Sequence, residues 1–245
     1  MAELTAAVID RLTVRGTPLV ERLQFLPAQA AATAEAVRAA RAATGRDLIV
    51  TFAGHDHGLI EAPSLVVAYN DLDAVRDAFS EHPGRIAAVI TEAAGVNAGV
   101  LAPLPGFNGA LALVVQKRGA LLVLDETHTG FRVGPAGWWG LEAAGVTGST
   151  GWRPDLVILG GFGGGASLAA LGGPAVILGR GPVASRAWNA DAREAALATL
   201  RHATPEVYAR ADRVADVITI ALHESLAAAG VAHVIPRAGS LFSVA

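Results

Sequence analysis

The chain has 245 residues, a formal net charge of −3 at pH 7 and 52% hydrophobic residues, so it can bury a large core and is not disordered. The mild acidity argues against a dedicated nucleic-acid binder. The absence of cysteine excludes disulfides, thiolate metal sites and cysteine nucleophiles. There is no long uncharged apolar run, and the acidic start lacks the pattern of a signal peptide. We therefore expect a cytoplasmic protein with no nucleic-acid or membrane partner.

Helical and strand patterns alternate along most of the chain. An alanine-rich helix is expected over 28–43, with Gly45 as its stop, and two more helices over 72–81 and 107–118. Short apolar runs predict buried strands over 48–52, 65–69, 86–91, 120–125, 156–159 and 175–178. Strands that alternate with helices indicate βαβ units, so the predicted fold class is α/β with a mostly parallel sheet.

The last part of the chain has a different pattern. The region from 191 to 229 is expected to be helical, and the segment 231–244 after Gly230 is expected to be extended. That segment looks like the start of a further unit.

Polar side chains gather where the predicted strands end. In open α/β sheets, ligands bind beyond the carboxyl ends of the strands, so this edge is the predicted site. The polar residues at this edge are His55, Asp56, His57, Glu92, Asn97, Asp125, Glu126 and His128, and a run of glycines follows the strand 156–159.

Two segments are distinctive together, LLVLDETHTGFRVG at 121–134 and PDLVILGGFGGGASLAALGG at 154–173. They resemble the class III, fold-type I aminotransferases, and most closely the glutamate-1-semialdehyde aminomutase branch. Further segments match this family in the same order, namely 20–47, 52–58, 69–79, 90–100 and 238–244. In this resemblance, 20–47 corresponds to the helix that follows the phosphate loop of the cofactor.

The resemblance implies a large domain with a mostly parallel sheet flanked by helices, in a homodimer with active sites at the subunit interface. It also implies an ancestry in pyridoxal phosphate (PLP) chemistry. By comparison with the family, we expect residues 1–230 to be a trimmed large domain and 231–245 a remnant of a largely missing C-terminal domain. The stretch between Gly58 and Tyr69 is also expected to be shortened.

Three cofactor anchors of the family are missing from the sequence. The family lysine aligns with Gly161 when residues are counted forward from the Pro-Asp-Leu segment, and with Gly160 when they are counted back from the glycine run that follows. The only lysine of the chain, Lys117, belongs to a predicted helix. The Ser-Gly-Thr phosphate loop is replaced by residues 27–31, Pro-Ala-Gln-Ala-Ala, which lack the hydroxyls and one N–H donor. Asp56 replaces the aromatic residue that stacks on the pyridine ring. We therefore expect no PLP cofactor.

Other positions of the family pocket are retained. Asp125 matches the carboxylate that pairs with the pyridinium nitrogen, and His57 matches the histidine of the aromatic-His-Gly turn. Glu92 and Asn97 match polar pocket positions. Ser185 and Asn189 match the loop that meets the partner subunit.

The first functional hypothesis is a PLP-independent enzyme whose former cofactor pocket binds a small amine or imine. Acid–base chemistry there would drive cyclisation, condensation, dehydration or isomerisation, in bacterial specialised metabolism. The catalytic candidates are Asp125, Asp56, His57, Glu92 and His128. The substrate-binding candidates are His55, Asn97, Thr127, Gly160, Gly161, Ser185 and Asn189.

Alternatives remain for the whole protein and for single residues. The protein could be a non-catalytic, aminotransferase-like binding or partner protein, or it could keep residual non-covalent PLP binding. Asp125 could have a structural partner such as Arg132 or His128, and Glu126 is expected to form a salt bridge or a helix cap. His55 and His57, on one face of a strand, could bind a metal together with Asp125.

One structural feature separates the two leading hypotheses. An enclosed pocket around Asp125 favours an enzyme, whereas a filled core with an exposed apolar patch favours a binding protein.

Overall fold

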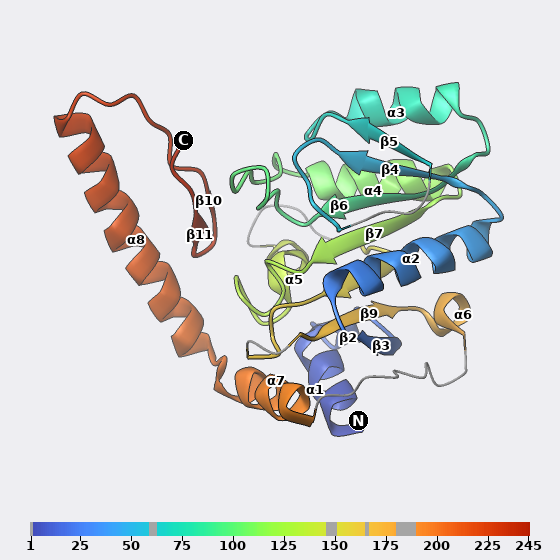
Figure 1. The fold of residues 1–245 in the computed structure, drawn as a ribbon, viewed down its shortest axis with the longest axis horizontal. Helices are drawn as coiled ribbons and strands as arrows, with labels where there is room; N and C mark the ends of the chain where they lie inside the picture. Colours follow the sequence, from blue (N-terminus) through green and yellow to red (C-terminus); the bar gives the residue numbers. More distant parts are fainter. Residues whose placement is uncertain (1, 59–62, 146–150, 165–166, 180–189) are drawn as a thin grey trace.

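The computed structural model describes residues 2–58, 63–145, 151–164, 167–179 and 190–245. Its centre is a seven-stranded sheet with the order β3-β9-β8-β7-β6-β4-β5 (Figure 1). The strands are β3 Arg22–Leu26, β4 Leu48–Phe52, β5 Ser64–Val67, β6 Ile86–Glu92, β7 Leu121–Glu126, β8 Leu156–Leu159 and β9 Ala169–Gly173. All neighbours from β8 to β5 are parallel, and β9 is antiparallel to both β8 and β3. The predicted α/β fold with a mostly parallel sheet is confirmed.

Helices cover both faces of this sheet (Figure 1). Apolar side chains of α2 and α6 pack on one face, and those of α1, α3, α4, α5 and α7 pack on the other. The helices are α1 Ala2–Arg11, α2 Gln29–Thr44, α3 Leu72–Glu81, α4 Phe107–Lys117, α5 Gly137–Ala143, α6 Ala175–Leu178, α7 Ala190–His202 and α8 Pro205–Ala228. Two hairpins complete the fold, β1 Thr13–Val14 with β2 Thr17–Pro18, and β10 Arg237–Ala238 with β11 Leu241–Phe242.

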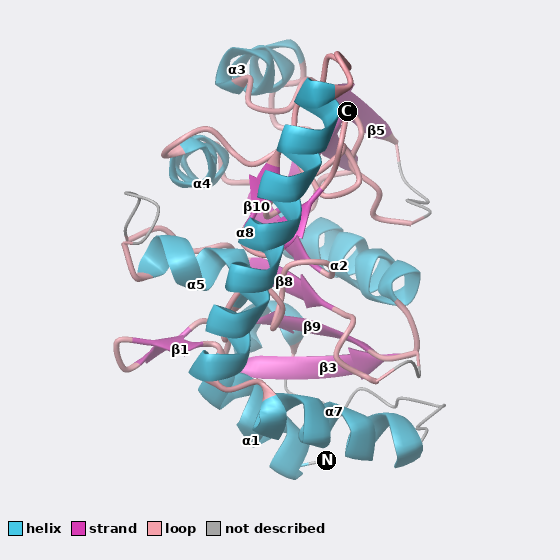
Figure 2. Cartoon of the chain, turned by 90° about the vertical axis from the view of Figure 1, so that its left-hand side faces the viewer, coloured by secondary structure: helices cyan, strands magenta, loops and turns pink. Residues whose placement is uncertain are grey.

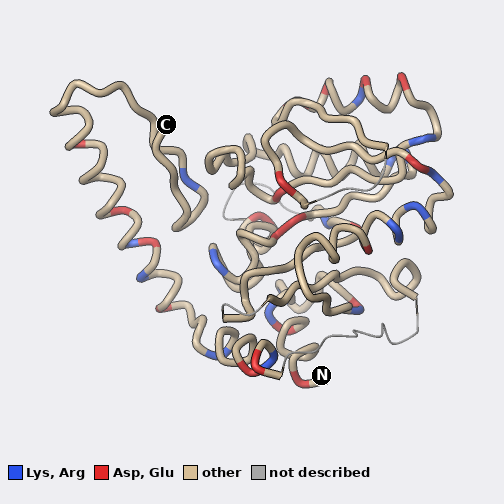
Figure 3. The backbone as a smooth tube through the Cα atoms, viewed as in Figure 1, with Lys and Arg blue, Asp and Glu red and all other residues tan. Residues whose placement is uncertain are grey.

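The alternation of side chains along β7 assigns its two terminal carboxylates to different layers. Val123 belongs to the core shared with α2, whereas Leu122 and Leu124 belong to the core on the opposite face. Because successive side chains point to opposite faces, Asp125 faces the α2 layer and Glu126 faces the α5 layer. Acidic residues end the central strands β6 and β7, while basic residues lie mainly on helices and loops (Figure 3).

Several predicted elements are confirmed nearly to the residue. Helix α3 begins where Asp71 accepts hydrogen bonds from the backbone N–H groups of Asp73 and Ala74, which is a typical N-cap. Helix α2 ends at Gly45, whose φ of 69° is easily adopted only without a Cβ atom. These local signals are readable in the sequence because they act within a few residues.

The predicted strand at 175–178 is wrong. This segment is the single helical turn α6, which begins after Pro174, and the strand is β9 just before it. Strand β9 is poor in β-branched residues because it packs tightly. A Cβ atom on Gly172 would lie 2.6 Å from Val20 Cγ1, and one on Gly173 would lie 2.5 Å from Leu156 Cδ2. The glycines that this packing requires hide the strand pattern.

Two further expectations need correction. Residues Arg22–Leu26 of the segment compared with a family helix form the edge strand β3, and the helix begins only at Gln29. The helical region after 190 is divided into α7 and α8, and Pro205 begins the second helix, as proline often does. The end of the chain is extended as predicted, with the short β10–β11 hairpin in it.

Helix α8 lies outside the layered core. It crosses one side of the molecule along nearly its whole height (Figure 2). Its buried residues are Ala215 and Thr219. An ion pair of 2.5 Å joins Asp216 to Arg237 of the C-terminal hairpin, and the Tyr208 hydroxyl donates to the Phe131 carbonyl at 3.1 Å. Within the described ranges, no helix combines the length and apolar character that a membrane span needs.

Candidate functional site

Two carboxylates lie side by side where β6 and β7 end. Glu92 and Asp125 are register partners in this parallel pair, and both are only 3% exposed. By the alternation of side chains, both face the layer of α2. Isolated ionised carboxylates are costly to bury, so the donors around them decide what this site can do.

Asp125 has a hydrogen bond at each of its acceptor positions. Its Oδ2 accepts from His57 Nδ1 at 2.8 Å and from Gln29 Nε2 at 3.0 Å. Its Oδ1 accepts from both the backbone N–H and the hydroxyl of Thr127. A carboxylate offers about four lone-pair positions, so these protein donors fill the acceptor capacity of Asp125.

These contacts also set the charge of Asp125. Burial raises the pKa of its carboxyl, but the hydrogen bond and charge of His57 and the hydrogen bonds from Thr127 outweigh burial. The net pKa therefore lies below its ordinary value, and Asp125 is ionised at neutral pH.

Glu92 holds the turn that follows β4. Its Oε1 accepts from the backbone N–H of Asp56 at 2.9 Å and from Asn97 Nδ2 at 2.8 Å, and its Oε2 accepts from the Asn97 N–H at 3.1 Å. The Glu92 N–H in turn donates to His55 Nδ1 at 3.1 Å. The predicted residues Glu92, Asn97, His55 and Asp56 thus meet in space, and their contacts are those of a braced loop.

Asp56 does not join the buried carboxylates. Its side chain is exposed, and its Oδ1 accepts from the Gly58 N–H at 2.8 Å in a local turn. The described residues therefore do not bring the three acidic catalytic candidates Asp56, Asp125 and Glu92 together around one cavity.

The metal alternative for the two histidines is also wrong in its geometry. His55 and His57 lie in a turn rather than on a strand, with ring centroids 5.9 Å apart, and each has a different partner. Over the described ranges, no three His, Asp or Glu side chains are grouped in a way that could hold a metal ion.

His55 lies in an apolar environment against the ring of Tyr69, with centroids 4.4 Å apart. Burial lowers the pKa of His55 to about 4. The nearby His57 also lowers this pKa, whereas the negative charges of Glu92 and Asp125 raise it. His55 Nε2, His57 Nε2 and the Tyr69 hydroxyl are buried without a hydrogen-bond partner in the described part of the chain. His55 is therefore neutral at physiological pH, and these three atoms leave polar capacity unused.

Two pockets lie beside the carboxylates but do not reach Asp125. One of about 210 Å³ is lined by the exposed His128 together with Arg132, Thr127 and Gly161. The other, of about 410 Å³, lies at the start of α2 and is lined by Gln29, Thr127, Gly160, Gly161 and Ser167, among others. His128, Thr127 and the two glycines therefore line pockets, and Asp125 does not; that any of these residues contacts a substrate stays a prediction.

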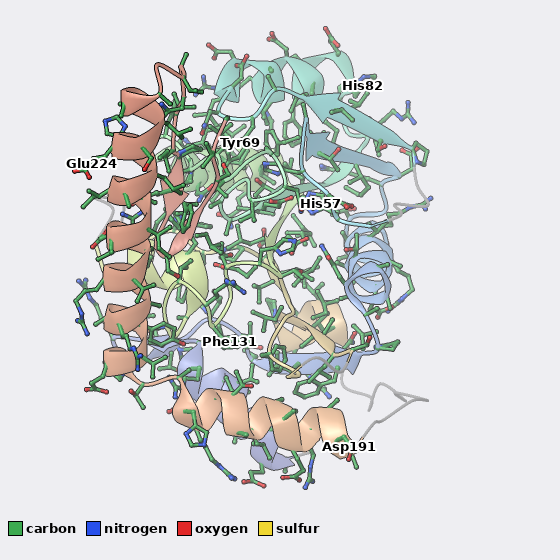
Figure 4. All side chains as sticks on the ribbon, turned by 60° about the vertical axis from the view of Figure 1, so that its left-hand side comes forward. His57, Tyr69, His82, Phe131, Asp191 and Glu224 are labelled. Atoms are coloured by element: carbon green, nitrogen blue, oxygen red, sulfur yellow. The ribbon has the colours of Figure 1, made fainter. Side chains whose placement is uncertain are left out.

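Gln29 is the part of the site that sequence reasoning missed. The comparison of residues 27–31 with the phosphate loop shows a glutamine in place of the family glycine, but it does not show what this side chain contacts. Its amide also donates to the Asp56 carbonyl at 3.2 Å, so it links the turn after β4 to Asp125. His57 lies beside α2 (Figure 4), where a Cβ atom on Gly58 would approach Ala30 to 3.0 Å. Arg132 and His128 are not the structural partners of Asp125, because His57 and Gln29 take that place.

Glu126 points to the other face and has the predicted capping role. It accepts from the backbone N–H groups of Trp138 at 3.1 Å and Trp139 at 2.8 Å, at the start of α5, and from the Thr129 hydroxyl. Burial raises the pKa of Glu126 to about 7, although these donors oppose the shift. Ser185 and Asn189 lie outside the described residues.

The residues present do not fit PLP in the way that the resemblance implies. Lys117 ends α4, and β7 begins only at Leu121 and then runs roughly 13 Å to Asp125, so Lys117 belongs to the opposite end of that strand. At the family lysine position, a Cβ atom on Gly160 would lie 2.6 Å from Thr127 Cγ2, and Gly161 has a left-handed φ of 73°. Asp125 has no acceptor position left for a pyridinium nitrogen.

Comparison with known proteins shows the family. The model of the family "Aminotransferase class-III" matches residues 62–245. The glutamate-1-semialdehyde 2,1-aminomutase of Cutibacterium acnes is 39% identical over 277 positions, which cover 99% of this chain and 62% of that relative. The chain thus spans under two thirds of the relative's length.

Solved structures agree on the fold. An omega-transaminase from Sphaerobacter thermophilus matches 99% of this chain and 63% of its own, with a TM-score of 0.82 and 25% identity. A β-phenylalanine aminotransferase from Variovorax paradoxus matches 99% of this chain and 58% of its own, with a TM-score of 0.80 and 28% identity. The family model over residues 62–245 and the relative at 39% identity show that the chain belongs to the class III aminotransferase family.

Proposed function

We propose that this protein is a non-catalytic member of its family that works as a binding protein and does not use PLP. The observation that carries the proposal is the closed network around Asp125. His57, Gln29 and Thr127 supply donors to both carboxylate oxygens, so the group that would meet a cofactor is bound to the protein itself.

Proton transfer needs a group that a substrate can reach. A general acid or base acts within hydrogen-bond distance of the proton that it moves. Asp125 is 3% exposed, its pKa is lowered rather than raised, and Glu92 has three donors of its own. Both carboxylates therefore have structural duties that compete with catalysis.

The surface supports the same proposal. Helix α8 exposes large apolar side chains, among them Val207 at 50% and Val217 at 68%. Contiguous exposed apolar residues typically mark interaction sites. A filled carboxylate site together with an exposed apolar patch is the combination expected of a binding protein.

The PLP-independent enzyme remains the second candidate, because one specific observation favours it. The 410 Å³ pocket next to Gln29 and Thr127 has room for a small amine or imine, and Ser167 adds a hydroxyl to its lining. In this version, Gln29 would move aside and expose Asp125 to the ligand. Cyclisation, condensation, dehydration and isomerisation remain the reaction classes for it.

Several further properties accompany both candidates as proposals. One is the division into a trimmed large domain at 1–230 and a remnant of a C-terminal domain at 231–245. A homodimer and a cytoplasmic location also remain proposals. Light scattering would test the first of these two, and cell fractionation would test the second.

The experiment that tests the function combines cofactor titration with native mass spectrometry. Purified protein is incubated with PLP, desalted and examined by absorbance, and an untreated sample is weighed intact. We expect no retained cofactor band and no co-purifying small molecule. Retained PLP would overturn the proposal, and a bound metabolite that is lost on substitution Thr127→Val would move the assignment to the enzyme.

A further inference from the structure

The smaller of the two pockets beside the carboxylates has a basic lining. Its volume is about 210 Å³, below the roughly 300–1,000 Å³ typical of pockets for drug-sized ligands. The side chains in its lining that can carry a positive charge are Arg132 and His128, and no Asp or Glu occurs among the described residues that line it. An anion that enters this pocket therefore meets basic side chains without a competing carboxylate.

The donors of Arg132 and His128 are unused within the described part of the chain. Both side chains are exposed, and neither forms an ion pair or a side-chain hydrogen bond with a described residue. The hydroxyl of Thr199, which lines the pocket from α7, has no partner there either. A guanidinium binds a carboxylate or a phosphate through two parallel N–H···O bonds, and an imidazole and a hydroxyl can add further bonds. The lining thus offers several donors to one oxyanion group.

The backbone of the turn that carries Arg132 has an unusual conformation. Phe131 has a φ of 56°, in the left-handed region that bulky side chains rarely adopt. Two hydrogen bonds hold it there. The Phe131 carbonyl accepts from the Tyr208 hydroxyl at 3.1 Å, and the Arg132 N–H donates to the Thr129 carbonyl at 3.1 Å. Backbone strain of this kind costs free energy and clusters at ligand-binding sites, so it independently supports a site at this turn.

Part of the pocket lining is apolar. The rings of Phe131 and Phe162 are buried and meet edge to face, with centroids 5.2 Å apart. In Figure 4, Phe131 lies next to α7, the helix that carries Thr199. Gly160 and Gly161 add no side chain to the lining, which leaves room for the body of a ligand. A molecule that suits both parts of the lining has an apolar body and one oxyanion group.

We infer that this pocket binds a small organic anion. Its carboxylate or phosphate group is held by Arg132, His128 and Thr199, and its apolar body lies against the two phenylalanine rings. The inference goes beyond the proposed function, because it assigns a ligand to a pocket that Asp125 does not line. A ligand held by exposed side chains exchanges with solvent, so it is titrated into the protein rather than sought in purified samples. Cofactor titration and this titration therefore give separate results.

Calorimetric titration with three probes tests the site. Benzoate and phenyl phosphate each carry an oxyanion group on an apolar ring, and benzamide is the neutral analogue of benzoate. We expect at least one of the two acids to bind with a Kd of about 1 mM or below, and benzamide to bind at least about tenfold more weakly than benzoate. The acid that binds more tightly identifies the oxyanion group that suits the pocket.

Substitutions then assign the binding to this pocket. Arg132→Gln should weaken binding of the acid at least about tenfold, because it removes the charge and the two parallel hydrogen bonds. Thr199→Val keeps the shape of the side chain but removes its hydroxyl, and should weaken binding about threefold. Arg118→Gln is the matched control. Arg118 is also exposed and has no ion pair in the ranges that the structure describes, but it lies outside the pocket.

Three results would overturn the inference. Equal affinity of Arg132→Gln and Arg118→Gln for the acid is one, and binding of benzamide as tight as that of benzoate is another. The third is no binding of either acid at about 10 mM, because that concentration reveals even a millimolar Kd. Circular dichroism confirms that each variant is folded, so a loss of binding reports on the pocket.

Discussion

Asp125 and Glu126 are neighbours on β7, and both are buried, yet their surroundings shift their pKa values in opposite directions. Asp125 faces α2 and meets an imidazole, so its pKa is lowered. Glu126 faces α5 and meets only neutral donors, so burial dominates and raises its pKa to about 7. One residue of offset along a strand thus separates a charged network from a helix cap, because the side chains alternate between layers.

The difference shows what kind of partner a buried carboxylate needs. Backbone N–H groups satisfy hydrogen bonding without compensating the full cost of a buried charge. His57 gives Asp125 both a hydrogen bond and an electrostatic contribution that lowers its pKa, and Gln29 and Thr127 supply the remaining donors. The comparison predicts that these two neighbours will respond differently to substitution and to pH.

The largest effect is expected from removing the cap. Glu126→Ala leaves the N–H groups of Trp138 and Trp139 and the Thr129 hydroxyl without an acceptor, and should lower the free energy of unfolding by about 4 kcal/mol. Urea denaturation followed by tryptophan fluorescence measures it. With both variants measured at pH 4.5, Glu126→Gln, which keeps one acceptor oxygen, should cost about 1 kcal/mol. Equal losses for both variants would show that the cap does not depend on acceptor oxygens.

The pH dependence separates the raised pKa of Glu126 from the lowered pKa of His55. Between the ordinary value of 4.5 and about 7, folded Glu126 keeps a proton that the unfolded chain has released, so its contribution to stability falls as pH rises. Relative to the wild type, Glu126→Gln should therefore gain up to roughly 3 kcal/mol between pH 4.5 and 7.

His55 should behave in the opposite sense. Between about 4 and 6.5 the unfolded histidine binds a proton that the folded one does not, so its contribution rises with pH. His55→Asn should thus lose stability relative to the wild type as pH rises through this window, because it removes that gain. Denaturation curves at several pH values measure both variants, and slopes of the same sign would contradict the assigned environments.

The smallest effect is expected at Gln29. Gln29→Ala removes one of the two donors to Asp125 Oδ2 from a half-buried position, and should cost about 1 kcal/mol. Gln116 provides a matched control, since its amide donates to the Arg153 carbonyl at 3.0 Å at an exposed site and has no contact with Asp125 among the described hydrogen bonds. Gln116→Ala should change stability by less than about 0.5 kcal/mol. A neutral Gln29→Ala would mean that His57 and Thr127 satisfy Asp125 without it.

Much of the fold follows from the sequence because its determinants are local. The Asp71 cap, the Gly45 stop and the apolar runs of β4, β6, β7 and β8 can each be read within a short window. Strand β9 could not be found in this way. Its glycines are required by close packing against Val20 and Leu156, which are distant in sequence.

The sequence predicts which residues form the site better than it predicts the hydrogen bonds between them. The sequence identifies the polar residues at the strand ends, and Glu92 contacts both Asn97 and His55. What the sequence could not show is which donor each carboxylate takes. The choice of Gln29 over Arg132 for Asp125 depends on the placement of α2 over the sheet, and that is a property of the assembled layers.

The contact between Gly160 and Thr127 gives the loss of the family lysine a direction in evolution. A lysine at 160 would press on Thr127 Cγ2, so Thr127 would have to change first. Yet Thr127 supplies two of the donors of Asp125, so changing it first would leave a buried carboxylate short of partners. In the alignment that places the family lysine at 160, each single reversion is therefore expected to lower stability until the other is made.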